Sequence, residues 1–148
     1  YTLILIHCTI LMIGGHYTYA EVPLFDTIKE LLNQDRNNYD KVGHFFQGFV
    51  PAIIAREILI RKNIIPHTNW RDFFIVCFCL ALSSFYEIVE CVIALFSKES
   101  AEDFLGTQGY IWDTQSDMGL ALIGAIIALI LLSKYHDKQL KKLDLSIH

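Results

Sequence analysis

MGLALIGAIIALILL, residues 118–132, contains no charged or polar side chain. A helix on the surface of a soluble protein keeps one polar face, and this run has none. Extended to residues 117–133, it approaches the roughly 20 apolar residues that cross the hydrocarbon core of a bilayer. The run therefore predicts a membrane-spanning helix, and a soluble helical bundle is the less favoured alternative.

Three further apolar blocks accompany this run, at residues 1–15, 42–60 and 72–96. The predicted fold class is therefore all-α, a polytopic transmembrane helix bundle with at least four spans, of which the first is truncated. The chain begins at Tyr1 in the middle of an apolar run, so further N-terminal helices are expected ahead of it. Residues 1–148 are expected to form a single transmembrane domain.

Local signals predict where two of the spans begin and how one of them packs. Asn69-x-x-Asp72 and Thr114-x-x-Asp117 are typical of N-caps, so they predict the starts of the third and fourth spans. Small residues let membrane helices approach closely. The fourth span carries a row of them at Ala121, Gly124, Ala125 and Ala128.

Composition and charge limit the class of function. Hydrophobic residues make up 53% of the 148 residues, which implies membrane lipids as partners, and the net charge of −4 argues against a nucleic-acid partner. The four cysteines lie in apolar blocks and include no CxxC pair. We read them as buried reduced thiols and not as a disulfide or a zinc site.

Basic residues predict the orientation across the membrane. Seven of them lie between the second and third spans or in the tail: Arg61, Lys62, Arg71, Lys134, Lys138, Lys141 and Lys142. The opposite side carries four basic residues among many acids. The C-terminus is therefore predicted to be cytoplasmic. Near the inner boundary, Glu57 and Arg61 are four residues apart and are expected to pair, while His136 is expected to lie in a solvated tail.

Six polar side chains from three spans are predicted to reach one depth near the outer boundary: Asp40, His44, Glu87, Glu90, Asp113 and Asp117. At about 1.5 Å of rise per residue, Glu87 and Glu90 lie about 24 Å and 28 Å beyond Arg71, in a core about 30 Å thick. A carboxylate within a span is costly, so it usually faces the bundle interior and serves a function. The alternative is that the aspartates cap helices and the glutamates bond to nearby backbone or hydroxyl groups.

These six residues are the candidate catalytic residues. Imidazole with several carboxylates, and no thiolate at that depth, suits a hard or borderline divalent metal ion. The candidate metal ligands are His44, Glu87, Glu90 and Asp117. Such an ion could activate water or polarise a phosphoryl oxygen, whereas paired carboxylates could act as acid and base without a metal. The pattern matches neither HExxH nor the Glu-x-x-His of di-iron bundles, so the cofactor and the enzymatic nature of the protein both stay open.

Four motifs resemble those of a known family: HYTYAEVPLFD (16–26), NNYDKVGHFFQGFVPAIIARE (37–57), SSFYEIVE (83–90) and FLGTQGYIWDTQSDM (104–118). They closely resemble the YjdF-type, or DUF2238, family, and the resemblance covers nearly the whole chain. It implies a multi-pass protein of the bacterial inner (cytoplasmic) membrane. More distantly, the spacings of the six candidate residues are similar to the signature of VanZ-like membrane proteins, which are associated with tolerance to glycopeptide antibiotics.

Three classes of function are open at this point. The first is a membrane-embedded enzyme, with or without a metal, that acts on a lipid or lipid-linked envelope substrate. The second is a proton-coupled transporter that uses Glu87 and Glu90 as proton sites. The third is a non-catalytic accessory subunit that packs against other membrane-protein subunits. Bound metal or lipid would favour the first, a wet path to Arg56 the second, and dry, cap-like carboxylates the third.

Overall fold

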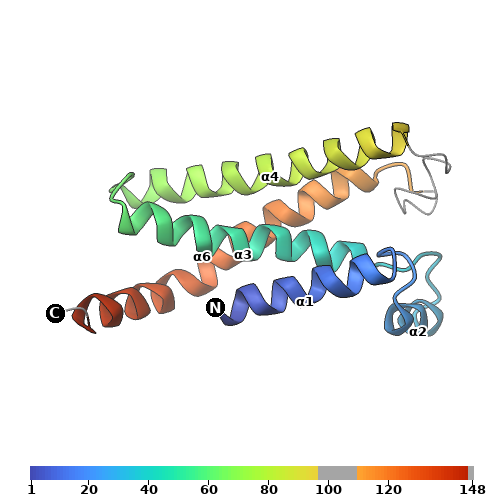
Figure 1. Cartoon of the computed structure of the whole chain (residues 1–148), viewed down its shortest axis with the longest axis horizontal. Helices are drawn as coiled ribbons and strands as arrows, with labels where there is room; N and C mark the ends of the chain where they lie inside the picture. Colours follow the sequence, from blue (N-terminus) through green and yellow to red (C-terminus); the bar gives the residue numbers. More distant parts are fainter. Residues whose placement is uncertain (97–109, 147–148) are drawn as a thin grey trace.

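A computed structural model describes residues 1–96 and 110–146, and all regular structure in these residues is helical. The helices are α1 (Thr2–His16), α2 (Pro23–Leu31), α3 (Tyr39–Arg61), α4 (Thr68–Phe96) and α6 (Asp113–Ser146). Figure 1 shows the four long helices running lengthwise in alternating directions, with α2 at the end where α3 and α6 begin. The all-α prediction is confirmed for the described residues. Residues 104–109 of the last quoted motif lie outside them.

Among the described residues, two helices are long and apolar enough to cross a membrane. Within α4 and α6, these are Thr68–Phe96 and Asp113–Leu143, with mean hydropathies of 1.9 and 2.1. α1 is apolar but has 15 residues, which at about 1.5 Å each is shorter than a bilayer core. α3 has 23 residues but includes Asp40, Arg56 and Glu57. The length and hydropathy of the helices therefore support two of the four predicted spans.

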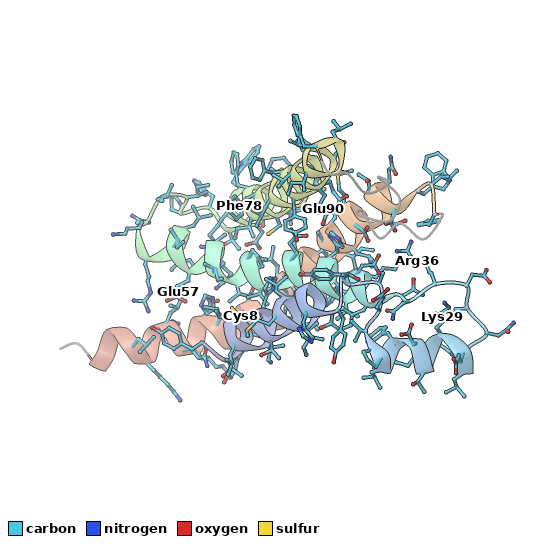
Figure 2. All side chains as sticks on the ribbon, turned by 45° about the vertical axis from the view of Figure 1, so that its right-hand side comes forward. Cys8, Lys29, Arg36, Glu57, Phe78 and Glu90 are labelled. Carbon is cyan, nitrogen blue, oxygen red and sulfur yellow. The ribbon has the colours of Figure 1, made fainter. Side chains whose placement is uncertain are left out.

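The outward faces of α4 and α6 are apolar, as contact with lipid requires. Phe78 and Ile88 of α4 are 50% and 60% exposed, and Ile130 of α6 is 72% exposed. Figure 2 shows Phe78 on α4, on the side away from α1. Soluble monomers rarely expose continuous apolar faces of this extent. The prediction that all four cysteines are buried holds for Cys79 and is wrong for the three on helix surfaces: Cys8, Cys77 and Cys91.

The bundle is organised around α3, which packs against α1, α4 and α6. Its closest approach is to α6, because both helices carry glycine there. A Cβ atom added to Gly48 would strike the backbone carbonyl of Ala121, and one added to Gly124 would strike the carbonyl of Phe45. The predicted small-residue row of α6 is therefore confirmed as a helix–helix contact. One turn before this contact, α3 carries His44 and α6 carries Asp117.

Several predicted helix boundaries are wrong. α4 begins at Thr68 and α6 at Asp113, so Asn69 and Thr114 lie inside first turns and do not cap them. The side chain of Thr114 instead lies near Glu87 of α4, across the bundle. The sequence reading also missed α2, which begins with proline in its first turn, and the continuation of α6 to Ser146.

Candidate functional site

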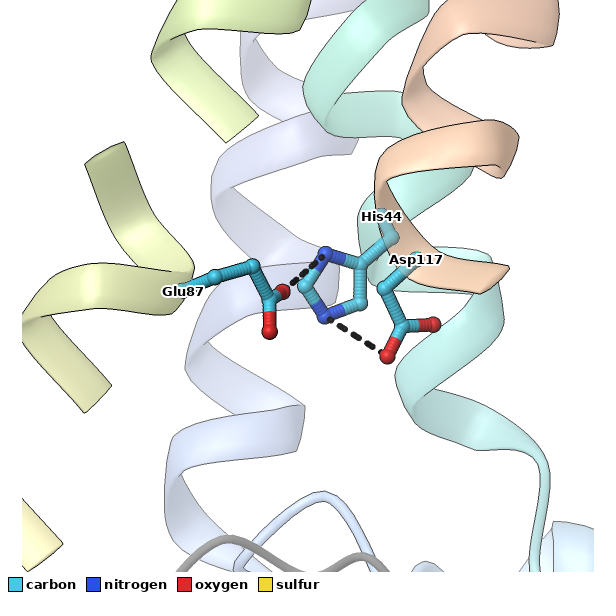
Figure 3. Close-up of side chains that lie close together, drawn as sticks. All are labelled: His44, Glu87 and Asp117. Atoms are coloured by element: carbon cyan, nitrogen blue, oxygen red, sulfur yellow. Dashed lines mark ion pairs between the residues drawn. The ribbon is translucent and has the colours of Figure 1, made fainter. Parts of the chain in front are cut away.

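Three helices bring an imidazole and two carboxyl groups together inside the bundle. The ring of His44 on α3 lies between Glu87 of α4 and Asp117 of α6 (Figure 3). Its Nδ1 is 3.6 Å from Oε1 of Glu87, and its Nε2 is 3.8 Å from Oδ2 of Asp117. The side chains of His44, Glu87 and Asp117 are 11%, 9% and 4% exposed. One donor atom from each lies within 4.8 Å of the other two, an arrangement that can hold a metal ion.

Gln47 fixes the hydrogen on the His44 ring. The Nδ1 atom of His44 lies 3.0 Å from the side-chain oxygen of Gln47, one turn further along α3. An amide oxygen can only accept, so Nδ1 donates in this contact, and in the neutral ring Nε2 is then the acceptor. Metal-binding histidines are oriented in the same way, by donating their second N–H to an oxygen. The free lone pair of His44 therefore points to the side of Asp117.

Two carboxylate oxygens in this cluster have no hydrogen-bond partner among the described residues. They are Oε1 of Glu87 and Oδ1 of Asp117, and both are buried. Nearly all buried polar atoms in native proteins are paired, because an unpaired one loses its hydration without compensation. These two oxygens are therefore the atoms of the cluster best suited to receive a cation or a water hydrogen.

A second carboxylate set adjoins the first and shares Asp117 with it. Oxygens of Asp40, Asp113 and Asp117 lie within 4.8 Å of one another. Arg36, in the connection between α2 and α3, donates to Asp113 at 2.5 Å and also to Asp40. Burial alone would lower the pKa of Arg36, but these two carboxylates outweigh it and raise that pKa, so the guanidinium stays charged. Tyr110 covers the guanidinium, with its ring centroid 5.5 Å from Cζ of Arg36.

The two carboxylate sets border a cavity of about 270 Å³. Apolar or aromatic side chains from three segments complete its wall, including Leu11 of α1, Tyr19, and Leu82 and Tyr86 of α4. Tyr19 lies between α1 and α2 and donates to the carbonyl of Leu11 at 3.3 Å. Burial raises the pKa of Tyr19, which keeps its hydroxyl neutral. The cavity thus combines a strongly acidic end with an apolar wall.

The structure gathers all six predicted site residues around this cavity. Five of them line it, namely Asp40, His44, Glu90, Asp113 and Asp117, while Glu87 faces His44 from the side of α4. Of the four predicted metal ligands, Glu90 belongs to neither of the two compact donor sets. The catalytic and metal-binding roles of these residues stay predictions. Sequence reasoning missed Arg36, although its position four residues before Asp40 is a spacing at which opposite charges pair.

Comparison with known proteins identifies the family. A family model described as "Predicted membrane protein (DUF2238)" matches residues 1–138. "Inner membrane protein YjdF" of Escherichia coli (strain K12) is 50% identical over 145 residues, which cover 98% of this chain and 69% of that protein. No solved structure matches the chain. The resemblance seen in the four motifs is confirmed: the chain belongs to the DUF2238 family of bacterial membrane proteins.

Proposed function

We propose that this chain is a membrane-embedded enzyme whose centre is a divalent metal ion held by His44, Glu87 and Asp117. The observation that carries the proposal is the contact between His44 and Asp117. With its hydrogen on Nδ1, the ring turns an acceptor, Nε2, toward a second acceptor, Oδ2 of Asp117, at 3.8 Å. Two buried acceptors that face each other repel unless a cation or a proton lies between them.

The donor set favours a metal ion over a single shared proton. A proton between Nε2 and Asp117 would still leave Oε1 of Glu87 and Oδ1 of Asp117 without a partner. A metal ion can bind one imidazole and both carboxylates at once, and three protein ligands leave a coordination position for water or substrate, as in catalytic zinc sites. One imidazole with two carboxylates suits borderline ions such as Zn²⁺, Fe²⁺ or Mn²⁺. Such an ion polarises a substrate oxygen or lowers the pKa of bound water.

Glu90 is the acid–base group in this proposal. It borders the same cavity as His44 and Asp117 but stands outside both compact donor sets. A carboxyl group near the reacting atoms that does not bind the metal can accept a proton from an attacking water and return it to a leaving group. Its place on α4, one turn after Glu87, puts it on the same face of the helix as that ligand.

The substrate in this proposal is a lipid or a lipid-linked envelope precursor. Leu11 of α1 and Leu82 of α4 give the cavity an apolar wall next to its acidic end. α1 packs against α3 and has little or no contact with α4, so an acyl chain can enter from the bilayer between α1 and α4. We infer that α1 and α3 also span the membrane, that the C-terminus is cytoplasmic, and that the site faces the outer side of the inner membrane.

The alternative functions have less support. A proton-coupled transporter needs a polar path from the outer cluster toward Arg56. The cavity beside His44 and the cavity beside Glu57 and His136 share no lining residue. The same helices, α3, α4 and α6, also form an apolar core around Ala52, Ile75 and Ala125, which offers no polar path. An accessory subunit with cap-like carboxylates accounts for Asp40, which accepts from the backbone N–H of Lys41 at 2.8 Å. It does not account for Oε1 of Glu87, which is buried without a hydrogen-bond partner among the described residues.

The proposed binding of a metal ion is tested by measuring the metal content of the protein. The protein is purified in detergent, loaded with Mn²⁺ or Zn²⁺, dialysed and analysed for metal. We expect one ion per chain in the wild type and less than about one tenth of that in His44→Ala, because the only imidazole ligand is lost. His136→Ala is the matched control, since it removes another buried histidine from the same bundle. Wild-type protein that binds no ion under either loading would contradict the metal centre.

The proposed enzymatic activity on a lipid is tested in bacterial membranes. Membrane lipids from bacteria that express wild type or Glu90→Gln are compared by mass spectrometry. We expect at least one lipid species that is consumed or formed with the wild type alone. Identical lipid profiles, together with proton flux through wild-type proteoliposomes that Glu87→Gln abolishes, would replace the enzyme with the transporter.

A further inference from the structure

We propose that Arg36 fills a second cation position beside the metal ion, and that this guanidinium limits the centre to one ion. The position is the set of Asp40, Asp113 and Asp117, whose oxygens lie within 4.8 Å of one another. Three carboxylates without an imidazole form a donor set for a hard cation such as Mg²⁺, Ca²⁺ or Mn²⁺. The inference depends on the proposed function only through Asp117, which both positions share.

Asp117 makes the two positions neighbours. Its Oδ2 is the oxygen nearest to His44, and its Oδ1 is buried without a hydrogen-bond partner among the described residues. The side chain is 4% exposed and lines the cavity. One carboxylate with two usable oxygens is the usual bridge of a two-metal site, in which the ions lie about 3.5–4 Å apart. Oδ1 of Asp117, which Arg36 does not contact, is thus the oxygen left for an ion to bind if the guanidinium is removed.

Arg36 already supplies one positive charge to the second position. Its two terminal nitrogens bind Asp113 and Asp40, one carboxylate each. The residue is 9% exposed and lies under the ring of Tyr110, so the guanidinium is held in place and is not a mobile surface group. A guanidinium on two carboxylates occupies their oxygens and repels a divalent ion. The charge balance of the site favours a bound cation: among the described residues, five carboxyl groups lie near two permanently positive side chains, Arg36 and Lys41.

The functional consequence is a centre with one metal and one arginine. In two-metal sites the second ion stabilises negative charge that develops on the substrate or leaving group. A guanidinium does the same with hydrogen bonds of fixed direction and without exchange. The centre would therefore act on a group whose oxygens become more negative during the reaction, with the metal on one side and Arg36 on the other.

The test removes the charge of Arg36 and counts the ions. Wild type, Arg36→Gln and Arg36→Lys are purified in detergent, loaded with Mn²⁺ and analysed for metal content and electron paramagnetic resonance. We expect one ion per chain in the wild type and in Arg36→Lys, with the spectrum of an isolated Mn²⁺. Arg36→Gln should bind two, with the spin-coupled spectrum of a pair. The double variant Arg36→Gln/Asp40→Asn should return to one ion.

Each outcome separates this inference from the proposed function. One ion in both wild type and Arg36→Gln would overturn the second position and leave the first intact. No ion in the wild type and one in Arg36→Gln would support the second position and contradict the proposed metal centre. Two ions in the wild type or in Arg36→Lys would overturn the role of the arginine charge. Arg36→Met, which has a similar length and no charge, replaces Arg36→Gln if that variant does not fold, and the same counts apply to it.

Discussion

The two ends of the α3–α6 pair bury charge in different ways. At the end where α3 terminates, named the inner end after its proposed cytoplasmic orientation, Arg56 is 2% exposed, donates to Asp137 at 2.7 Å and lies 3.0 Å from Nδ1 of His136. Glu57 accepts from Arg61 at 2.8 Å and lies 3.4 Å from Nε2 of His136. Every formal charge in this inner cluster has an opposite charge in contact. Its one buried atom without a hydrogen-bond partner among the described residues is Nε of Arg56, which belongs to a guanidinium that is already paired with Asp137.

The outer cluster has an excess of acceptors. No lysine or arginine among the described residues forms an ion pair with Glu87, Glu90 or Asp117, and the contacts of His44 to Glu87 and Asp117 are longer than hydrogen bonds. Figure 2 shows Arg36 and Glu57 toward opposite ends of the molecule. The same helices therefore carry a cluster of paired charges at one end and, at the other, a cluster with more carboxyl groups than positive charges. This difference is the reason to assign structure to the inner cluster and chemistry to the outer one.

The largest expected effect on stability comes from removing the carboxylate that pairs with Arg56 in the inner cluster. Asp137→Asn leaves the buried guanidinium of Arg56 without its carboxylate. Because Asp137 itself is 49% exposed, the free energy of unfolding should fall by less than for a fully buried pair, by about 2–3 kcal/mol. The measurement is denaturant unfolding in detergent, and Asp137→Glu, which keeps the charge, should recover most of the loss. If Asp137→Asn costs less than about 0.5 kcal/mol, the inner end is not a cluster held by paired charges and the comparison fails.

The next effect tests what holds the outer cluster in place. Gly124→Ala would force a methyl group against the carbonyl of Phe45, so it should destabilise the protein by about 2 kcal/mol and move α6 away from α3. Because Asp117 and His44 lie on these two helices, metal affinity should fall as well. Gly119→Ala is the matched control, since its Cβ meets nothing within 4 Å. It should leave metal content unchanged and raise stability by about 0.5–1 kcal/mol. Equal melting of the two variants would contradict the close contact.

Asp117→Asn should have opposite effects with and without metal. In metal-free protein the amide can donate to Nε2 of His44 and removes one of the facing acceptors, so stability should stay equal or rise by about 1 kcal/mol. With Mn²⁺ present, the wild type gains stability by binding the ion and the variant does not. The check is the melting temperature of both proteins with and without Mn²⁺. Destabilisation of the metal-free variant would mean that the outer carboxylates are already compensated, as the inner ones are.

The meeting of the polar residues was predictable from the sequence, because helix rise is constant and a buried carboxylate must face the bundle. That argument brought residues of three helices together before any contact was known. It could not decide which donors meet. Glu87 and Glu90 share a face of α4, and only the rotation of that helix against α3 turns Glu87 toward His44.

The errors have a physical cause in contacts between distant segments. Thr114 is a residue type that often caps helices, but here it lies within the first turn of α6 and near Glu87 of another helix. His136 was expected in a solvated tail and is 6% exposed, because α6 continues and packs against Arg56. Arg36 lies in a connection between helices, so the helical spacing that grouped the other polar residues did not include it. Local patterns define helices and their apolar faces, whereas long-range ion pairs depend on how those helices pack.

The smallest expected effect concerns the rim of the inner cluster. Arg61 and Glu57 are four residues apart on α3, and their side chains are 38% and 41% exposed. An exposed pair of this kind gains little, because water already solvates both charges and two long side chains must be ordered. Arg61→Gln should therefore change the free energy of unfolding by about 0.5 kcal/mol or less, in the assay used for Asp137→Asn. Glu57 would keep its contact with His136, so the cluster would stay intact. A loss as large as that of Asp137→Asn would mean that Arg61 belongs to the cluster itself, and that its charge balance extends to the membrane surface.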